Sequence, residues 1–540
     1  MRVAILDGYV DEPSCLGVPP YISPYPRYIA GAVEDSGHEY DYLTIDELRK
    51  GKRIEGGLLV LIAGALVPGK YLRGMPISNR EIAFVAEGFD GTKVLGGPLV
   101  RFGFHDGRFE KMYDYLAKKD LDACVSDFLE SGQFSDRNRE SEEWARWAVK
   151  GAKVSSKHPD FPQPLIAEID MSRGCARYFT GGCSFCIEPM YGEPYYRDNE
   201  DVIEEVGTLT RIGVTNFRLG GQACLFCYNA YGIGETERPE PNPAYIEELL
   251  KGIRKVAPDL RVLHTDNADP SVIAAHPSKA KEVLKLLVKY CTSGNVLSLG
   301  MESADPNVME KNNLNARPEE VIRAIEIINS VGARRGPTGL PYVLPGINFI
   351  SGLKGETKET FQLNCRFLKD VLDSGLLLRR INIRQVLEVR GSFPVRRHYK
   401  EFRAFKKRVR EEIDRSMLEK IVPRNTVMKQ VYLELKKGKK TFGRQIGSYP
   451  ILVGMPYERD LNQFVDVIVL DHGYRSVTGI EHPLDINKAT LGALASIPGI
   501  GAKRAARIVR ARPVRTKEDF IFSLDDEKVA MQVLDYVKIG

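Results

Sequence analysis

The first 130 residues alternate short apolar runs with segments whose apolar positions recur at helical spacing. The runs Val3–Leu6, Leu58–Ile62 and Lys93–Leu95 predict buried strands, whereas Pro26–Val33 has the spacing of a helix. This alternation is typical of a small parallel α/β sheet. We therefore expect a Rossmann-like domain over residues 1–130.

A polar stretch over residues 131–163, which holds both Trp residues of the chain, predicts a linker with one helix. From Pro164 the alternation of strand and helix becomes regular and predicts a partial β/α (TIM-like) barrel over residues 164–394, with its chemistry at the carboxyl ends of the strands. The predicted strands are Leu165–Ile169, Thr215–Leu219, Arg261–His264, Val296–Gly300, Ile347–Ser351 and Ile381–Gln385, and the predicted helices are the segment after Asn199, Ile246–Val256, Pro318–Ser330 and Lys358–Leu372.

The C-terminal part consists of three segments with different predicted secondary structure. Residues 395–440 are basic and predict a helical connector. Residues 441–482 predict a small β-barrel or sheet, with strands at Gly447–Val453, Phe464–Leu470 and Arg475–Ile480. Residues 483–540 have a helical pattern again. The fold class expected for the whole chain is thus α/β, followed by a small β domain and a helical domain.

Composition narrows the class of protein. With 43% hydrophobic and 28% charged residues in 540 and no long biased tract, most of the chain should fold. The 77 Lys and Arg against 72 Asp and Glu give a net charge of only +5, so any contact with nucleic acid must be local. The longest apolar run, Gly57–Val67, is shorter than the roughly 18 to 20 residues that span a bilayer. The start, MRVAILDGYVDEP, has no secretory pattern. We expect a cytoplasmic protein with no membrane partner.

The nine cysteines are odd in number and unevenly spaced, which does not resemble a disulfide framework. Cys175, Cys183 and Cys186 lie together in MSRGCARYFTGGCSFCIEP, directly after a predicted strand and in a Gly-rich loop. Three thiolates can bind three corners of a 4Fe-4S cluster and leave one iron open to a small molecule. The alternatives are a structural zinc site, which usually has four closed ligands or three with water, and unliganded thiols.

At these residues the chain resembles the radical S-adenosylmethionine (radical SAM) superfamily, over about residues 164–390. Seven residues separate Cys175 from Cys183, where the common form has three, but the Cys-x-x-Cys ending with its aromatic Phe185 matches. The resemblance implies that the three cysteines hold the 4Fe-4S cluster and that Phe185 lies at the cofactor. It also implies an electron donor as a partner, because the cluster gives one electron to the sulfonium of S-adenosylmethionine and a 5′-deoxyadenosyl radical results.

Three further segments carry the same resemblance. LGGQ resembles the Gly-Gly-Glu motif that receives the methionyl amino group, with Gln222 in place of the acid. SLGMESADPNVM resembles the signature facing the ribose and methionyl groups, and INFISGLKGET resembles the Gly-rich strand end beside the adenine. Singly, each glycine could be a turn residue and each acid a surface residue, but the ordered set favours the superfamily. The cofactor-binding residues so implied are Gly220, Gly221, Gln222, Glu302, Ser303, Ile350 and Gly352.

Two other groups follow predicted strands of the same region. Cys224 and Cys227 are candidate catalytic residues, as a redox dithiol, a substrate-handling thiol or ligands of a second cluster; the alternative is a pair of buried small hydrophobic residues. His264, Asp266 and Asn267 could contact substrate, or form an ordinary hydrogen-bonded loop.

The N-terminal region resembles the cobalamin-binding domains that are fused to some radical enzymes, through residues 16–43 and LGGPLVRFG at 95–103. The resemblance implies either bound cobalamin or a degenerate scaffold or docking domain. An Asp-x-His-x-x-Gly sequence for a lower cobalt ligand is absent. Only Cys15 and Cys124 occur there, so the second cluster of the methylthiotransferases, which takes three cysteines, is not expected.

Residues 484–514 resemble a helix-hairpin-helix motif. Gly499 and Gly501 allow a tight turn, after which the free N–H groups of a helix N-terminus can bind a phosphate. The alternative is a protein-docking module. Residues 464–480 resemble a TRAM-type RNA-binding barrel, an OB-like fold. Six cations follow the turn without an intervening acid: Lys503, Arg504, Arg507, Arg510, Arg512 and Arg515.

Together these resemblances imply a radical SAM enzyme whose C-terminal modules bind a nucleic acid, tRNA, for methylation or methylthiolation. One alternative keeps the radical chemistry but gives it a protein or small-molecule substrate. The other is a nucleic-acid-binding protein whose cluster is structural or redox-sensing.

Overall fold

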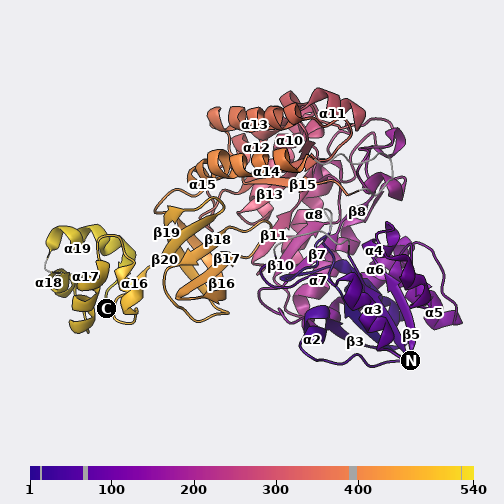
Figure 1. Cartoon of the computed structure of the whole chain (residues 1–540), viewed down its shortest axis with the longest axis horizontal. Coiled ribbons are helices and arrows are strands. Elements are labelled where there is room, and N and C mark those ends of the chain that lie inside the picture. Colours follow the sequence, from indigo (N-terminus) through magenta and orange to yellow (C-terminus); the bar gives the residue numbers. More distant parts are fainter. Residues whose placement is uncertain (12–14, 65–70, 388–397, 525) are drawn as a thin grey trace.

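The computed structural model describes residues 1–11, 15–64, 71–387, 398–524 and 526–540 (Figure 1). The N-terminal part is a parallel sheet in the order β3-β1-β4-β5-β6. Its strands are β1 (Arg2–Asp7), β3 (Glu39–Thr44), β4 (Leu58–Ile62), β5 (Thr92–Gly96) and β6 (Tyr115–Leu116). Both faces are apolar, because parallel sheets are covered by helices on both sides.

Alternate residues of β1 enter two separate cores. Val3 and Ile5 pack in the core that contains Ile29 of α1 (Pro24–Asp35), whereas Ala4 and Leu6 pack with Ile82 of α3 (Asn79–Glu87). The remaining helices of this part are α2 (Ile45–Arg49), α4 (Pro98–Arg101) and α5 (Leu121–Ser131). The sequence prediction of an α/β sheet is confirmed in this region.

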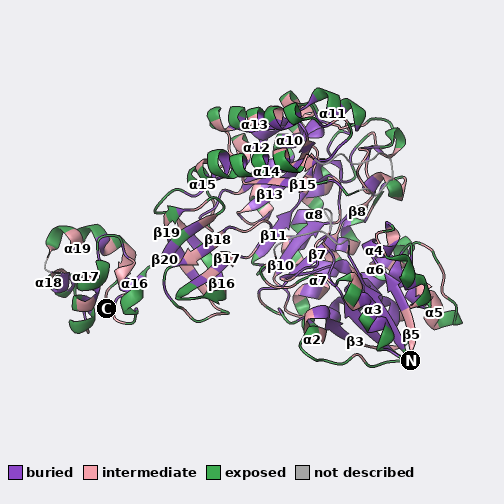
Figure 2. Cartoon of the chain, in the orientation of Figure 1, coloured by how far each residue is buried: buried purple, intermediate pink, exposed green. Residues whose placement is uncertain are grey.

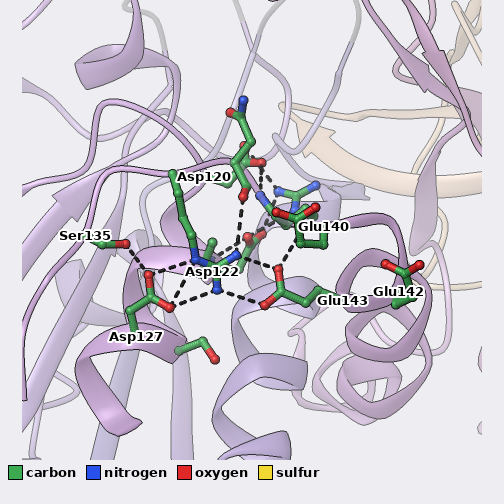
Figure 3. A network of polar contacts seen from close by, with 12 residues as sticks. Asp120, Asp122, Asp127, Ser135, Glu140, Glu142 and Glu143 are labelled. Atoms are coloured by element: carbon green, nitrogen blue, oxygen red, sulfur yellow. Dashed lines mark hydrogen bonds and ion pairs between the residues drawn. The ribbon is translucent and has the colours of Figure 1, made fainter. Parts of the chain in front are cut away.

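The predicted linker packs tightly on the N-terminal part. Its helix α6 (Ser141–Lys150) lies against α1, where a Cβ on Gly31 would meet the Trp147 carbonyl oxygen at 2.1 Å. Trp147 is fully buried, and its Nε1 donates to Asp35 at 3.0 Å. Figure 3 shows a network of polar contacts that includes Asp122, Asp127 and Glu143. Arg137 pairs with Asp127 and Glu143, and Arg139 pairs with Asp122. The segment between the two predicted domains is therefore packed onto the N-terminal part.

The central region consists of two four-stranded parallel sheets, β11-β10-β7-β2 and β12-β13-β14-β15. All six predicted strands are present, with boundaries that differ by a few residues. Two short strands were not predicted, and β2 comes from the N-terminal part of the chain. The strands are β2 (Tyr21–Ile22), β7 (Ile166–Asp170), β10 (Asn216–Gly220), β11 (Val262–Thr265), β12 (Asn267–Ala268), β13 (Asn295–Glu302), β14 (Val343–Ser351) and β15 (Arg380–Gln385).

Helices cover the outside of these sheets, and Figure 2 shows that the buried residues gather on the strands while outer helix faces are exposed. The helices are α7 (Asn199–Arg211), α8 (Pro243–Val256), α9 (Pro270–Ala275), α10 (Pro277–Tyr290), α11 (Pro306–Lys311), α12 (Pro318–Gly332) and α13 (Lys358–Asp373). The predicted boundary at residues 394 and 395 lies outside the described residues, and the domain boundaries as a whole stay predictions.

The prediction of helix through residue 440 is wrong after residue 421. Helices α14 (Tyr399–Arg408) and α15 (Arg415–Ile421) are present, but Val427–Lys437 is strand β16. Its basic end, KKGKK, forms a hairpin to β17 (Lys440–Gln445), in which Gly438 has a φ of 57°. The Lys-rich segment is thus the exposed tip of a hairpin. Exposed lysines are also typical of a basic helix, so the composition alone did not distinguish the two structures.

Strand β16 completes a closed barrel in the order β16-β17-β18-β20-β19. Its other strands are β18 (Leu452–Met455), β19 (Phe464–His472) and β20 (Ser476–Glu481). The predicted small β-barrel is therefore confirmed in kind, but it begins earlier than predicted. The strand predicted at Gly447–Val453 exists only from Leu452, because residues 446–451 form a loop that we call the bridging loop.

The bridging loop enters the central region beside β11. The Ser448 N–H donates to His264 Nδ1 at 2.9 Å, and the Tyr449 hydroxyl donates to Asp266 Oδ1 at 2.8 Å. Asp266 also pairs with the buried Arg218. A Cβ on Gly447 would lie 2.6 Å from the His264 ring, so only glycine allows this approach. Of the two interpretations of His264 and Asp266, the structure supports the structural one.

The same loop connects the outer strands of the two central sheets. The hydroxyl of Tyr21, in edge strand β2, donates to the Gly447 carbonyl at 3.3 Å. At edge strand β15, Arg379 donates to the Tyr449 carbonyl at 2.5 Å and the Arg380 guanidinium lies 3.9 Å over the Tyr449 ring. The small barrel is thus docked across the open side of the central region.

The last residues form a separate helical unit, drawn yellow in Figure 1 at the opposite end from the N-terminal sheet. It contains α16 (Leu491–Ala495), α17 (Gly501–Arg510), α18 (Lys517–Leu524) and α19 (Glu527–Val533). Strand β21 (Leu484–Asp485) pairs with β22 (Val537–Lys538) and so joins the two ends of the unit. Within the described ranges, none of the helices has the length and apolar character needed to cross a membrane.

Candidate active site at the cysteine loop

The three clustered cysteines lie on one loop at the carboxyl end of β7. The loop is closed by an antiparallel pair, β8 (Ser172–Arg173) with β9 (Tyr195–Tyr196). Cys175, Cys183 and Cys186 are all partly exposed. The site is therefore at the end of the strands where the sequence predicts the chemistry of a β/α region.

Arg177 organises this loop. Its backbone N–H donates to Cys175 Sγ at 3.4 Å, and its guanidinium donates to Cys183 Sγ at 3.2 Å and to the Asn313 carbonyl at 2.9 Å. Donors aimed at sulfur stabilise thiolates and the sulfurs of an iron cluster. Arg177 was not predicted as a site residue, although its position two residues after Cys175 indicates that it lies close to the cysteines.

The cysteine sulfurs fit metal-bound groups better than free thiolates. Burial raises the pKa of Cys175 and of Cys183 to about 12, and that of Cys186 well above the ordinary thiol value. Metal binding removes the thiol proton, so iron would stabilise the charged form that burial disfavours. Among the described residues, no group of three or more His, Cys, Asp or Glu is arranged to hold a single metal ion. A cluster differs in needing each thiolate at a different iron.

Gln222 offers a free acceptor at the end of β10. It is 1% exposed, its Nε2 donates to the Leu219 carbonyl at 3.1 Å, and its Oε1 has no partner among the residues that the structure describes. A buried acceptor without a donor is costly, so this oxygen fits the ammonium group of a ligand. The residue predicted for the methionyl amino group therefore has the chemistry that the role requires.

The glycines before Gln222 are needed for space. A Cβ on Gly220 would lie 1.8 Å from Glu168 Oε1, and one on Gly221 would lie 2.1 Å from Asp170 Oδ1. Gly221 also has a φ of 54°. These glycines thus let the backbone pass over the buried Glu168 carboxylate and the half-buried Asp170 carboxylate, a packing reason that the sequence pattern could not reveal.

Glu302 lies in a strained position at the end of β13. Its φ is 58°, and the pairing of β13 with β14 shifts register between Gly300 and Glu302. Burial raises the pKa of Glu302 to about 8. The pKa of Cys183 is raised mainly by burial and next by the Glu302 carboxylate. The Cys183 thiol and the Glu302 carboxylate are therefore close enough to interact electrostatically. Ser303 is buried, and its Oγ accepts from the Asp305 N–H at 3.1 Å.

Two residues predicted to bind the cofactor, Phe185 and Ile350, come together in the structure. Phe185 and Ile350 pack against one small apolar cluster of Val308, Leu353 and Val386. Gly352 has a φ of 95°, and its N–H donates to Glu356 Oε2 at 3.0 Å. An apolar wall next to the cysteine loop suits a flat base, while the Gly352 N–H is already used within the protein.

Cys224 and Cys227 lie beside the cysteine loop. They belong to a turn at the end of β10 and line, with Cys175, Arg177 and Asp269, a cavity with about 340 Å³ of empty volume. Both are buried, and the Asp269 N–H donates to Cys224 Sγ at 3.2 Å. The structure thus brings Cys224 and Cys227 to one cavity with Cys175, whereas Cys183 and Cys186 are not among the residues that line it.

A second cavity, with about 480 Å³ of empty volume, lies where the N-terminal part meets the central region. Arg101, Arg139 and Arg173 line it and pair with the buried Asp120. Burial opposes ionisation of Asp120, but the three arginines outweigh it and hold its pKa below the ordinary value. The sequence analysis missed this site, because its residues come from three distant segments.

The predicted nucleic-acid residues lie on the C-terminal unit. Gly499, in the turn before α17, has a φ of 89°, and Gly501, the first residue of α17, has a φ of 53°. Arg504 donates to the Gly499 carbonyl at 2.8 Å and pairs with Asp526, and Arg512 donates to the Ile486 carbonyl at 2.8 Å. These two arginines therefore stabilise the unit itself. The cations left exposed are Lys503, Arg507, Arg510 and Arg515.

Comparison with known proteins gives consistent matches. The model of the "Radical SAM superfamily" matches residues 169–368. An uncharacterised protein of Methanocaldococcus jannaschii is 45% identical over 508 residues, which cover 88% of this chain and 93% of its own. A tRNA-2-methylthio-N(6)-dimethylallyladenosine synthase of Ehrlichia ruminantium is 25% identical over 210 residues, covering 39% and 41%. Among solved structures, the radical S-adenosylmethionine methyltransferase TsrM from Kitasatospora setae, with cobalamin and a [4Fe-4S] cluster bound, aligns with a TM-score of 0.47 and 14% identity, covering 71% and 72%.

Proposed function

This chain belongs to the radical SAM superfamily, and we propose that it methylates or methylthiolates a nucleic acid, with tRNA as the substrate class. It is an enzyme, and its cofactors are the 4Fe-4S cluster and S-adenosylmethionine that the superfamily uses. The finer proposal rests on the C-terminal unit, which contributes a basic helix apart from the radical site.

The residues at and around the cysteine loop have different roles in binding the cofactors. When bound, the cluster and S-adenosylmethionine supply the radical that abstracts hydrogen from the substrate. Cys175, Cys183 and Cys186 would bind the iron, and Arg177 donates to two of their sulfurs and fixes the loop. Gln222 Oε1 would accept from the methionyl ammonium group, and Phe185 with Ile350 would exclude water from the adenine side.

The single observation that carries the nucleic-acid proposal is helix α17. Its first residue, Gly501, and the preceding Gly499 both have positive φ. Lys503, Arg507 and Arg510 are exposed along the helix. A helix N-terminus with free N–H groups and nearby cations binds phosphate. The similarity to a tRNA methylthiolation enzyme over 39% of the chain supports tRNA as the nucleic acid.

The proposal is made without cobalamin. The cavity between the N-terminal part and the central region is lined by Arg101, Arg139 and Arg173, whose guanidinium groups pair with the buried Asp120. These charged groups are thus already paired within the protein, and no step is derived through cobalamin.

The test is an anaerobic assay of the reconstituted enzyme with dithionite and S-adenosylmethionine, with and without bulk tRNA. We expect 5′-deoxyadenosine to form faster with tRNA and a tRNA nucleoside to gain the mass of a methyl or methylthio group. Cofactor cleavage that ignores tRNA, with tRNA of unchanged mass, would reject the substrate proposal and leave a protein or small molecule. The affinity for tRNA should fall steeply with salt, because phosphate contacts release counterions.

A further inference from the structure

Cys224 and Cys227 are joined by one tight turn. The Cys227 N–H donates to the Cys224 carbonyl at 3.1 Å, and the 3-10 turn Leu225–Cys227 follows. Side chains three residues apart eclipse one another in such a turn. The two sulfurs therefore lie on the same side of the backbone, and the Cys227 thiol hydrogen-bonds the Cys224 sulfur.

The two sulfurs are not equivalent. Cys224 Sγ accepts from the Asp269 N–H at 3.2 Å and from the Cys227 thiol. Cys224 is thus the acceptor of two hydrogen bonds, one from the backbone and one from its partner cysteine. Cys227 acts as the donor in this pair and keeps its proton. The arrangement makes Cys224 the attacking sulfur and Cys227 the resolving one.

The pair also lines a cavity beside the cysteine loop. Both cysteines line the cavity with about 340 Å³ of empty volume, together with Tyr196 and Arg177. Cys291 and Cys124 are buried as well, but neither is among the residues that line this cavity. We propose that Cys224 and Cys227 form a thiol–disulfide exchange site for small disulfides. This inference does not depend on the nucleic-acid proposal.

The exchange balances without a further reactant. The Cys224 thiolate attacks one sulfur of a small disulfide, forms a mixed disulfide and releases one thiolate. Cys227 then attacks the Cys224 sulfur, the Cys224–Cys227 disulfide forms, and the second small thiol leaves with the proton of Cys227. The protein dithiol is oxidised by two electrons and the small disulfide is reduced by two.

The test uses cystamine as the probe and the full chain, isolated anaerobically with its iron. After acid quenching, alkylation with iodoacetamide and trypsin digestion, both cysteines fall in the peptide of residues 219–251, because Pro239 blocks cleavage after Arg238. We expect this peptide to lose two hydrogens and to resist alkylation. In Cys227→Ser, one cysteamine should remain on Cys224, whereas Cys224→Ser should react at least tenfold more slowly.

The chain contains a matched control. Cys183 and Cys186 have the same spacing and the same backbone turn, with a Cys186 N–H to Cys183 carbonyl distance of 3.1 Å, but Arg177 binds the Cys183 sulfur. Their peptide, residues 178–197, should stay fully alkylated. The proposal is overturned if the 219–251 peptide of wild type is fully alkylated, or if both serine variants trap cysteamine equally fast. The alkylation of the 219–251 peptide is measured on wild type alone, so misfolding of a variant cannot affect that result.

Discussion

Gly221 is restricted in both backbone conformation and space. Its φ of 54° disfavours a side chain, and a Cβ would lie 2.1 Å from Asp170 Oδ1. The neighbouring Gln222 depends on this geometry for the direction of its free oxygen. The backbone geometry that only glycine allows at position 221 thus fixes the position of the Gln222 oxygen, the atom expected to bind the ligand.

Gly221→Ala should lower the affinity for S-adenosylmethionine by more than about tenfold, because a tenfold change needs only about 1.4 kcal/mol and the clash must displace the loop. Equilibrium dialysis of the reconstituted protein measures it. Gly181→Ala is the matched control, since Gly181 has a φ of 80° but open space around its Cβ. It incurs the left-handed cost of about 1–2 kcal/mol without the clash. Equal losses in both variants would contradict the role of Asp170.

The sequence predicted the candidate site residues because each lies in a motif of fixed order. Cys175, Gln222 and Glu302 could be named from their neighbours in the chain, and the structure places all three at the carboxyl ends of strands. Arg177 and Asp170 could not be named, because their roles depend on which atoms they approach in space.

At the scale of elements, the bridging loop holds the small barrel on the central region through neutral His264. Burial lowers the pKa of His264 to about 4, and its Nδ1 must stay unprotonated to accept from the Ser448 N–H. In the unfolded chain the group titrates near its ordinary value of about 6.5. Protonation therefore favours the unfolded state.

The stability that His264 contributes should be complete above pH 6.5 and lost as the pH falls from 6.5 towards 4. Between pH 7.5 and 5.0 the loss is about 2 kcal/mol, at about 1.4 kcal/mol per pKa unit. Thermal unfolding at the two pH values measures it, with His264→Gln as the comparison, because glutamine keeps an acceptor that does not titrate. A wild-type midpoint that falls no more than that of the variant would contradict this coupling.

The fold was predictable wherever apolar runs were bounded by turn residues, as at Leu58–Ile62, which is β4 with the same limits. It was not predictable at β16, where an exposed Lys-rich hairpin tip imitates a basic helix. Strand β2 also escaped prediction, because two residues carry no periodicity and owe their strand conformation to the pairing with β7.

At the scale of the whole molecule, the radical site and helix α17 lie in different parts of the chain (Figure 1). A substrate that uses both must be long, as a folded RNA is. Charge on α17 should therefore control binding without altering the chemistry at the cysteine loop.

The double variant Lys503→Glu with Arg510→Glu should weaken tRNA binding at least tenfold and reduce the slope of log affinity against log salt by about 2, one per lost phosphate contact. Filter binding across a salt series measures both. Arg366→Glu with Lys369→Glu reverses two exposed cations on α13 and is the matched control. Cofactor cleavage without tRNA should be the same in both doubles. An equal slope for the two would show that α17 does not contact phosphate.

The bridging loop also has a consequence for solubility. Strands β2 and β15 have a partner on one side only, and unpaired strand edges attract other chains. Gly447 and Tyr449 lie against the ends of both edges through Tyr21 and Arg379. The small barrel thus protects the central region from edge-to-edge aggregation, and a chain cut before residue 427 should precipitate even though its radical site is complete.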